Sequence, residues 1–216
     1  MSIYLHIGNG KTGSTSIQTF IEENAEMLRT RGYVFPVCAG RRNHRRFAMY
    51  AHDDHVIDNL RRAKKLTTPE RIVAFRAQFR EEFLQEEKTW NADQTVLVSS
   101  EQMSRLHVDS AQRRLFDLLA ETGRRVRVII YLRAQHEAIV SEYSQFIKGG
   151  KTTTLEHEIA LASDRKMYRY AQTVRSWANV FGAENLIVRP YERRQLKDAD
   201  VVADYMHIVG LGDLHG

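Results

Sequence analysis

The chain has 216 residues, of which 43% are hydrophobic and 27% are charged, a composition that fits one globular domain. Its single cysteine, Cys38, excludes an internal disulfide framework and a cysteine metal cluster. The first residues lack a signal-peptide pattern, and no stretch approaches the roughly 18 apolar residues of a membrane span. These features predict a soluble, cytoplasmic protein with one domain over residues 1–216.

The net charge is +5, and the basic residues are clumped within 41–46, 61–65 and 124–127. Clumped cations suit a polyanionic ligand such as a nucleotide, an acidic glycan or a nucleic acid. For the second clump, a solvated helix face is an equally good interpretation.

The first third of the chain predicts a strand, a helix and a second strand. Residues 2–8 form an apolar run long enough for a buried strand, and 14–31 carry apolar side chains at helical spacing. A short strand follows at 33–36. Residues 37–67 are rich in charge and histidine and give only a helical hint.

The middle of the chain carries clearer signals. Pro69 follows a threonine and opens a helix as its first residue. Residues 95–99 and 126–132 are apolar runs that predict buried strands. Between them, Asp109 and Gln112 have the spacing of a capping box at the start of another helix.

The last third predicts a helix at 135–147, a helix from Asp164, a strand at 186–188 and a helix at 198–209. The apolar stripe of the helix from Asp164 is expected to consist of Met167, Ala171, Val174, Ala178 and Phe181. Strands that alternate with helices and are apolar on both faces predict a three-layer α/β domain with a central, mostly parallel sheet flanked by helices.

Ligands of such sheets bind at the carboxyl ends of the strands, so the loop at 8–16 after the first strand is the first place to look for a site. Its glycines allow close approach to an anion, and the following helix offers unpaired N–H groups. Lys11 adds a charge, and hydroxyl groups come from Thr12, Ser14, Thr15 and Ser16. All of these features suit a phosphate group.

The loop is not a Walker A motif, because the glycine that this motif needs six residues before its lysine is Leu5 here. The strand at 95–99 is followed by Ser100 and Glu101, with no aspartate placed to bind Mg²⁺. A nucleotide kinase or ATPase is therefore the weaker hypothesis.

The segment His6–Ser16 resembles the 5′-phosphosulfate loop of sulfotransferases, above all the bacterial members whose first strand is followed by K-T-G-[ST]-[ST]-S. The resemblance implies the P-loop-like sulfotransferase fold and 3′-phosphoadenosine 5′-phosphosulfate (PAPS) as the sulfonate donor. It also implies that the 5′-phosphate and the sulfonate are held by Gly10, Lys11, Thr12, Gly13, Ser14, Thr15 and Ser16.

A second segment resembles the 3′-phosphate motif of the same family. Arg133 ends the strand at 126–132, and Ser141 follows eight residues later on a helix. A guanidinium and a hydroxyl suit a phosphate monoester, and a 3′-phosphate distinguishes PAPS from ATP. Residues 185–192 also resemble the family's late strand ending in Tyr-Glu.

The sequence departs from many cytosolic sulfotransferases after Val209. Those proteins close over the nucleotide with a glycine-rich, lysine-bearing C-terminal segment, which residues 210–216 do not resemble. Either this branch lacks the segment or the sequence is truncated, so the groups that cover the adenine are left open.

Transfer needs a general base for the acceptor and a cation for the leaving phosphate, and Lys11 suits the second role. Glu101 is expected on the same sheet edge as Lys11 and Arg133, which makes it the first choice of base. His44 is the second, with an acceptor or phosphate contact as its other role and an exposed loop histidine as the plain alternative. No residue spacing indicates a metal site.

The sequence thus predicts sulfonate transfer from PAPS to a hydroxyl or amine, with adenosine 3′,5′-bisphosphate as product and no metal. The basic segment 41–65 is expected over the acceptor side, which favours a carbohydrate or glycolipid acceptor. The alternatives are a kinase-like phosphotransferase that needs Mg²⁺ and ATP, and a non-catalytic nucleotide- or nucleic-acid-binding protein. Nucleic acid ranks last because few aromatic residues accompany the arginines.

Overall fold

The computed structural model describes residues 1–162 and 164–212. Its centre is a five-stranded sheet in the order β2–β3–β1–β4–β5, with every neighbouring pair parallel. The strands are β1 (Ser2–His6), β2 (Tyr33–Val34), β3 (Thr95–Ser99), β4 (Arg125–Leu132) and β5 (Leu186–Pro190). The predicted strands and the three-layer α/β class are confirmed.

The position of β1 at the centre of the sheet explains why the strand segments of the sequence are apolar runs without a regular alternation of polar residues. Leu5 pairs in register with Val98 of β3 and Val128 of β4, and none of the three has exposed surface. Helices cover both faces, so most side chains of the inner strands are buried.

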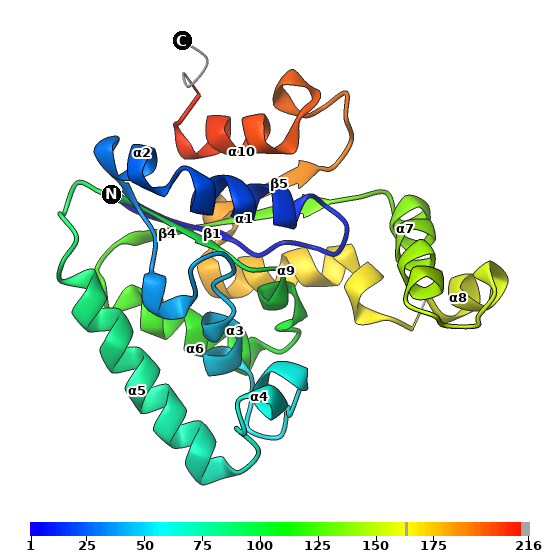
Figure 1. Cartoon of the computed structure of the whole chain (residues 1–216), viewed down its shortest axis with the longest axis horizontal. Helices are drawn as coiled ribbons and strands as arrows, with labels where there is room; N and C mark the ends of the chain where they lie inside the picture. Colours follow the sequence, from blue (N-terminus) through cyan, green and yellow to red (C-terminus); the bar gives the residue numbers. More distant parts are fainter. Residues whose placement is uncertain (163, 213–216) are drawn as a thin grey trace.

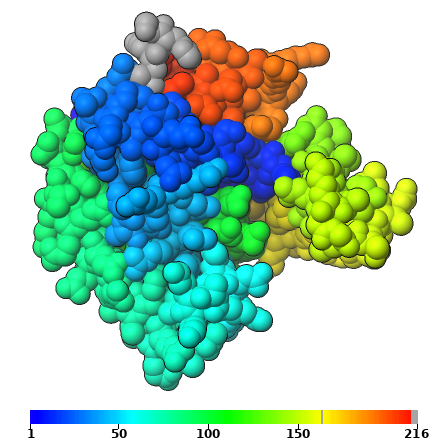
Figure 2. Space-filling model, viewed as in Figure 1, coloured from blue at the N-terminus to red at the C-terminus, as the bar shows by residue number. Residues whose placement is uncertain are grey.

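One face of the sheet is covered by α1 (Ser14–Glu23), α2 (Ala25–Thr30) and α10 (Val201–Val209). The other is covered by α3 (Arg46–Ala51), α5 (Pro69–Glu87), α6 (Asp109–Ala120) and α9 (Tyr170–Phe181), with α4 (Asn59–Ala63) at the margin (Figure 1). Helices α7 (Gln135–Lys148) and α8 (Leu155–Ala162) project from the body as a separate lobe (Figures 1 and 2). None of the described helices is both long and apolar enough to span a membrane.

Short 3₁₀ turns join these elements: η1 (Val37–Ala39), η2 (Glu101–Arg105), η3 (Lys166–Tyr168), η4 (Ala183–Asn185) and η5 (Lys197–Ala199). Two of them matter for the site. The η2 turn follows β3 directly, and η3 precedes α9. Residues 213–216, the end of the segment that the sequence analysis compared with the C-terminal segment of cytosolic sulfotransferases, lie outside the described residues.

Several predicted helix starts are corrected by the structure. The helix at 14–31 is broken at Asn24 into α1 and α2. The capping box is wrong, because the α6 N-cap is Val108 and the Gln112 amide instead donates to the Leu106 carbonyl at 2.7 Å. The helix expected at 198 begins at Val201, where the Asp200 side chain accepts from the first free N–H groups.

The helix expected from Asp164 starts only at Tyr170, because residues 166–168 form the η3 turn instead. Ala171 is exposed rather than inward. The buried face of α9 consists of Trp177, Val180 and Phe181, and the sequence analysis named only the last of these.

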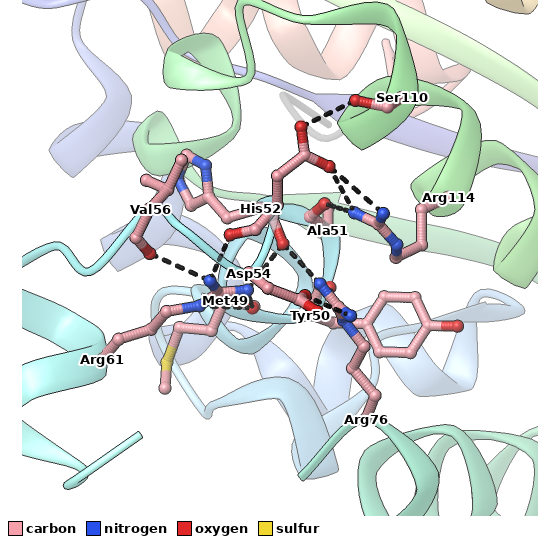
Figure 3. Close-up of polar contacts among 11 residues, drawn as sticks. Met49, Tyr50, Ala51, His52, Asp54, Val56, Arg61, Arg76, Ser110 and Arg114 are labelled. Carbon is pink, nitrogen blue, oxygen red and sulfur yellow. Dashed lines mark hydrogen bonds and ion pairs between the residues drawn. The ribbon is translucent and has the colours of Figure 1, made fainter. Parts of the chain in front are cut away.

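The segment between β2 and β3 is held by arginines that point inward (Figure 3). Arg61 has no exposed surface. Its guanidinium donates to the main-chain carbonyls of Met49, His52, Asp53 and Val56. Arg76 and Arg114 donate to further carbonyls of the same segment. Since these carbonyls end α3 and follow it, the arginines replace the hydrogen bonds that a helix end lacks.

This arrangement changes the interpretation of the basic clumps. Arg61 faces neither a polyanion nor solvent, so both alternatives for that residue are wrong. Arg46 pairs with Glu82 and Arg124 with Glu87. Much of the clumped charge therefore stabilises the chain's own structure.

Replacing Arg61 with leucine is expected to lower the free energy of unfolding by about 2–4 kcal/mol, because several buried carbonyls would lose their donor. Urea denaturation of Arg61→Leu beside Arg62→Leu, an exposed neighbour, measures the difference. Equal stabilities of the two variants would contradict the assigned role of Arg61.

Candidate functional site

The loop between β1 and α1 has an unusual backbone. Gly8, Lys11 and Gly13 all have positive φ, at 38°, 66° and 74°. For Lys11 this conformation is uncommon, and such strain persists where the surrounding structure imposes it, often at ligand sites. The Thr12 hydroxyl donates to the Asn9 carbonyl at 2.6 Å, and the Asn9 side chain accepts from the Gly10 N–H at 3.0 Å. The loop therefore holds its shape through its own hydrogen bonds.

These internal bonds divide the predicted phosphate donors into two groups. The Thr12 hydroxyl and the Gly10 N–H are already used inside the loop. Within the described residues, the N–H groups of 11–16 have no protein acceptor. The buried Ser14 Oγ also lacks a partner there. A ten-residue helix follows, so free N–H groups, an unpaired hydroxyl and the positive helix end occur together at the start of α1.

Glu101 lies against the start of this loop. A side-chain carbon built on Gly8 would come within 3.0 Å of the Glu101 Cα and 2.5 Å of the Ser14 Oγ. Gly8 therefore lets the chain after β3 approach the loop closely. Glu101 is half-buried and forms no ion pair with any described residue. Its carboxylate accepts from Gln102 Nε2 at 3.4 Å, while its main-chain carbonyl accepts from the Ser104 hydroxyl at 2.7 Å.

His44 is buried, so the expectation that it is a solvent-exposed loop histidine is wrong. It has no exposed surface. Its ring Nδ1 accepts the Ser99 N–H at 2.9 Å, and its main-chain N–H donates to the Ser99 carbonyl. His44 thus pairs with the end of β3. With Nδ1 accepting, the ring proton sits on Nε2, and burial lowers the pKa of His44 to about 3. In this state neither ring nitrogen has a free lone pair with which to take a proton from an acceptor substrate.

A second buried histidine lies beside it. His6 ends β1, and its Nδ1 is 2.8 Å from the Ser99 Oγ. Burial lowers the pKa of His6 to about 3 as well. Ser99 therefore engages both neutral rings, one through its side chain and one through its backbone.

Arg133 follows β4 and lies near the same loop. Its guanidinium carbon is 5.9 Å from the centre of the Tyr191 ring. That ring in turn lies against Gly13, where an added side-chain carbon would come within 3.3 Å of it. The Tyr191 N–H donates to the Leu132 carbonyl at 2.8 Å, which fixes Tyr191 beside the end of β4. Tyr191 therefore joins the two segments that the sequence analysis treated separately.

Arg133 is not free, since its Nε donates to Glu137 Oε2 at 2.9 Å. Ser141 lies further along α7 and is half-buried. An anion at Arg133 would have to compete with the Glu137 carboxylate, which is half-exposed and able to turn away.

Two residues of the site were missed as functional candidates. Tyr191 was visible in the sequence only as part of a late strand ending in Tyr-Glu. Asn9, whose side chain shapes the loop, gave no signal beyond its place between two glycines. In residues 1–162 and 164–212, no group of three His, Cys, Asp or Glu side chains could hold a metal ion.

No protein-family model matches the chain, and no curated protein matches it in sequence. Among solved structures, a sulfotransferase from Alicyclobacillus acidocaldarius is similar, with a TM-score of 0.59 and 14% sequence identity. The match covers 98% of this chain and 82% of that one. At this identity the likeness shows the fold alone: the chain has the sulfotransferase fold.

Proposed function

We propose that the protein transfers a sulfonate group from PAPS to a hydroxyl or amine of an acceptor. The observation that carries this proposal is the contact chain from Gly13 through Tyr191 to Arg133. It brings a loop suited to a 5′-phosphosulfate beside an arginine suited to a 3′-phosphate, and only a nucleotide with both groups uses both.

The donor supplies the sulfonate. The acceptor's oxygen or nitrogen bonds to sulfur while the sulfur–oxygen bond to the 5′-phosphate breaks and leaves its electron pair on that phosphate. The free N–H groups of 11–16, the Ser14 hydroxyl and Lys11 stabilise the charge that develops there. Glu101 takes the acceptor's proton, because it is the carboxylate beside the loop and has no cation holding it. His44 supports the end of β3 in this account.

Arg133 and Ser141 bind the 3′-phosphate. Arg133→Ala is expected to weaken binding of adenosine 3′,5′-bisphosphate and to leave 5′-AMP binding nearly unchanged. Glu137→Gln is expected to have the opposite effect on bisphosphate binding, because it removes the carboxylate that pairs with Arg133. An exposed ion pair of this kind is worth about 0.2–1 kcal/mol, so Glu137→Gln should tighten bisphosphate binding by up to about five-fold.

Calorimetric titration of both nucleotides into each variant measures these changes. If Arg133→Ala keeps the wild-type preference for the bisphosphate, the 3′-phosphate assignment fails.

A metal-independent reaction is also expected. The loop lacks the Walker A spacing and the strand before Glu101 lacks the acid that binds Mg²⁺ in kinases. Transfer from PAPS should therefore keep its rate in excess EDTA. A rate that falls in EDTA and recovers with Mg²⁺ would favour the kinase-like phosphotransferase.

The acceptor class and the location remain predictions: a carbohydrate or glycolipid, in the cytoplasm. The alternative of nucleic-acid binding loses support because Arg46, Arg61 and Arg124 are engaged inside the chain.

A further inference from the structure

A cavity of about 580 Å³ lies between the start of α6, the start of α7 and the first turns of α9. We call it the α9 cavity. His107 and Asp109 form one wall, Gln135 lies at a second, and residues 168–179 form the third. None of these residues has a role in the donor site described above.

Two walls of the α9 cavity are continuous in sequence with residues that pack against the loop at 8–16. Glu101 lies against Gly8 and begins the η2 turn, which ends at Arg105, two residues before His107. On the other side, an added side-chain carbon on Gly10 would meet Met167 at 3.3 Å, and Tyr168 next to it lines the cavity. A molecule in the cavity would therefore contact segments that are continuous with the residues packed against the loop.

The lining is mixed in polarity. Ala171 is the one aliphatic residue, Tyr168 and Tyr170 contribute aromatic rings, and the other lining side chains are polar or charged. Amide groups come from Gln135, Gln172 and Asn179. The Ser176 hydroxyl lies 2.9 Å from Asp109 Oδ1 and 2.7 Å from Gln112 Oε1, so this wall is already ordered. An apolar ligand would desolvate these groups without replacing their hydrogen bonds, whereas sugar hydroxyls would pair with them.

The cavity is also basic. Arg169 and Arg175 line it, against the single carboxylate of Asp109. Burial first, and then the charges of Lys166 and Arg105, lower the pKa of His107, which shows that further cations lie near this wall. Arg175 forms no ion pair with any described residue. Its guanidinium is a forked donor suited to a carboxylate.

We infer that the α9 cavity holds the non-reacting part of an acidic carbohydrate acceptor, with Arg175 pairing with its carboxylate. The inference rests on the proposed sulfonate transfer and names its acceptor class and acceptor site. This acceptor site differs from the one expected from the sequence, where the segment 41–65 was to cover the acceptor. In the structure, Arg61 of that segment donates to the carbonyls of His52, Asp53 and Val56.

The test uses three probes with the full chain saturated in adenosine 3′,5′-bisphosphate: the unsulfated chondroitin disaccharide, which carries glucuronate; neutral N-acetyllactosamine; and 4-nitrophenol. The chondroitin disaccharide is expected to bind best by calorimetry. Arg175→Gln should weaken its binding by about ten-fold or more, the usual effect of losing a hydrogen bond to a charged group. Arg31→Gln, the same charge change at an exposed position of the opposite helical layer, should leave it unchanged.

Tight 4-nitrophenol binding, equal binding of the two disaccharides, no disaccharide binding, or an unchanged affinity in Arg175→Gln would each overturn the inference. Bisphosphate affinity in the same samples separates the two proposals. If the bisphosphate binds normally while the disaccharide result fails, the acceptor assignment is wrong and the donor assignment stands.

Discussion

Lys11→Ala is expected to slow sulfonate transfer by about 10²–10³-fold, the usual cost of removing one preorganised donor to developing charge. Lys11 sits in the loop with positive φ and forms no ion pair with a described residue, so its charge is available to the donor. The effect should fall on kcat more than on nucleotide affinity, because the charge on the leaving phosphate develops during the reaction.

Two further variants make this test specific. Lys11→Met keeps an unbranched side chain, one atom shorter and without the charge, and its Cβ at the strained position, so it should lose activity to the same extent. Lys88→Ala, at an exposed lysine after α5, should keep the wild-type rate. Near-normal turnover in Lys11→Met would show that the ammonium group plays no part in transfer.

Glu101→Gln is expected to reduce transfer by about 10²–10⁴-fold, the range for loss of a general base. The substitution keeps the shape of the side chain and removes its basic oxygen. Because the contact with Gly8 involves the Glu101 backbone and Cβ, the loop and the affinity for adenosine 3′,5′-bisphosphate should be nearly unchanged. Steady-state rates and nucleotide titration on the same preparation measure both quantities.

His44→Asn is the matched comparison for Glu101→Gln. An asparagine can still accept the Ser99 N–H, so this variant is expected to keep most of its activity if it folds. If Glu101→Gln keeps near-normal turnover while folded His44→Asn loses it, the two roles are reversed. If neither variant changes the rate, another residue activates the acceptor.

The sheet was predictable because its strands carry a local signal. Leu5, Val98 and Val128 lie in runs that are buried on both faces, and such runs read as apolar without alternation. The loop at 8–16 was predictable for a related reason, since its glycines and hydroxyl residues are adjacent in the sequence.

The rest of the site depends on contacts between distant residues. Tyr191 meets Gly13 only because β5 lies beside β4 and β4 beside β1. His44 is buried because it pairs with Ser99, 55 residues later in the chain. Arg61 is buried because it binds carbonyls of a segment whose path the sequence does not reveal. Neither periodicity nor spacing reports such pairings.

The central claim is that the site binds a nucleotide carrying both a 5′-phosphate and a 3′-phosphate. Its most direct test is a calorimetric titration of the wild-type protein with adenosine 3′,5′-bisphosphate, 5′-AMP and Mg²⁺-ATP. The account predicts that the bisphosphate binds more tightly than 5′-AMP, without metal, and that ATP binds weakly or not at all. Tighter binding of Mg²⁺-ATP, or equal binding of 5′-AMP and the bisphosphate, would contradict it.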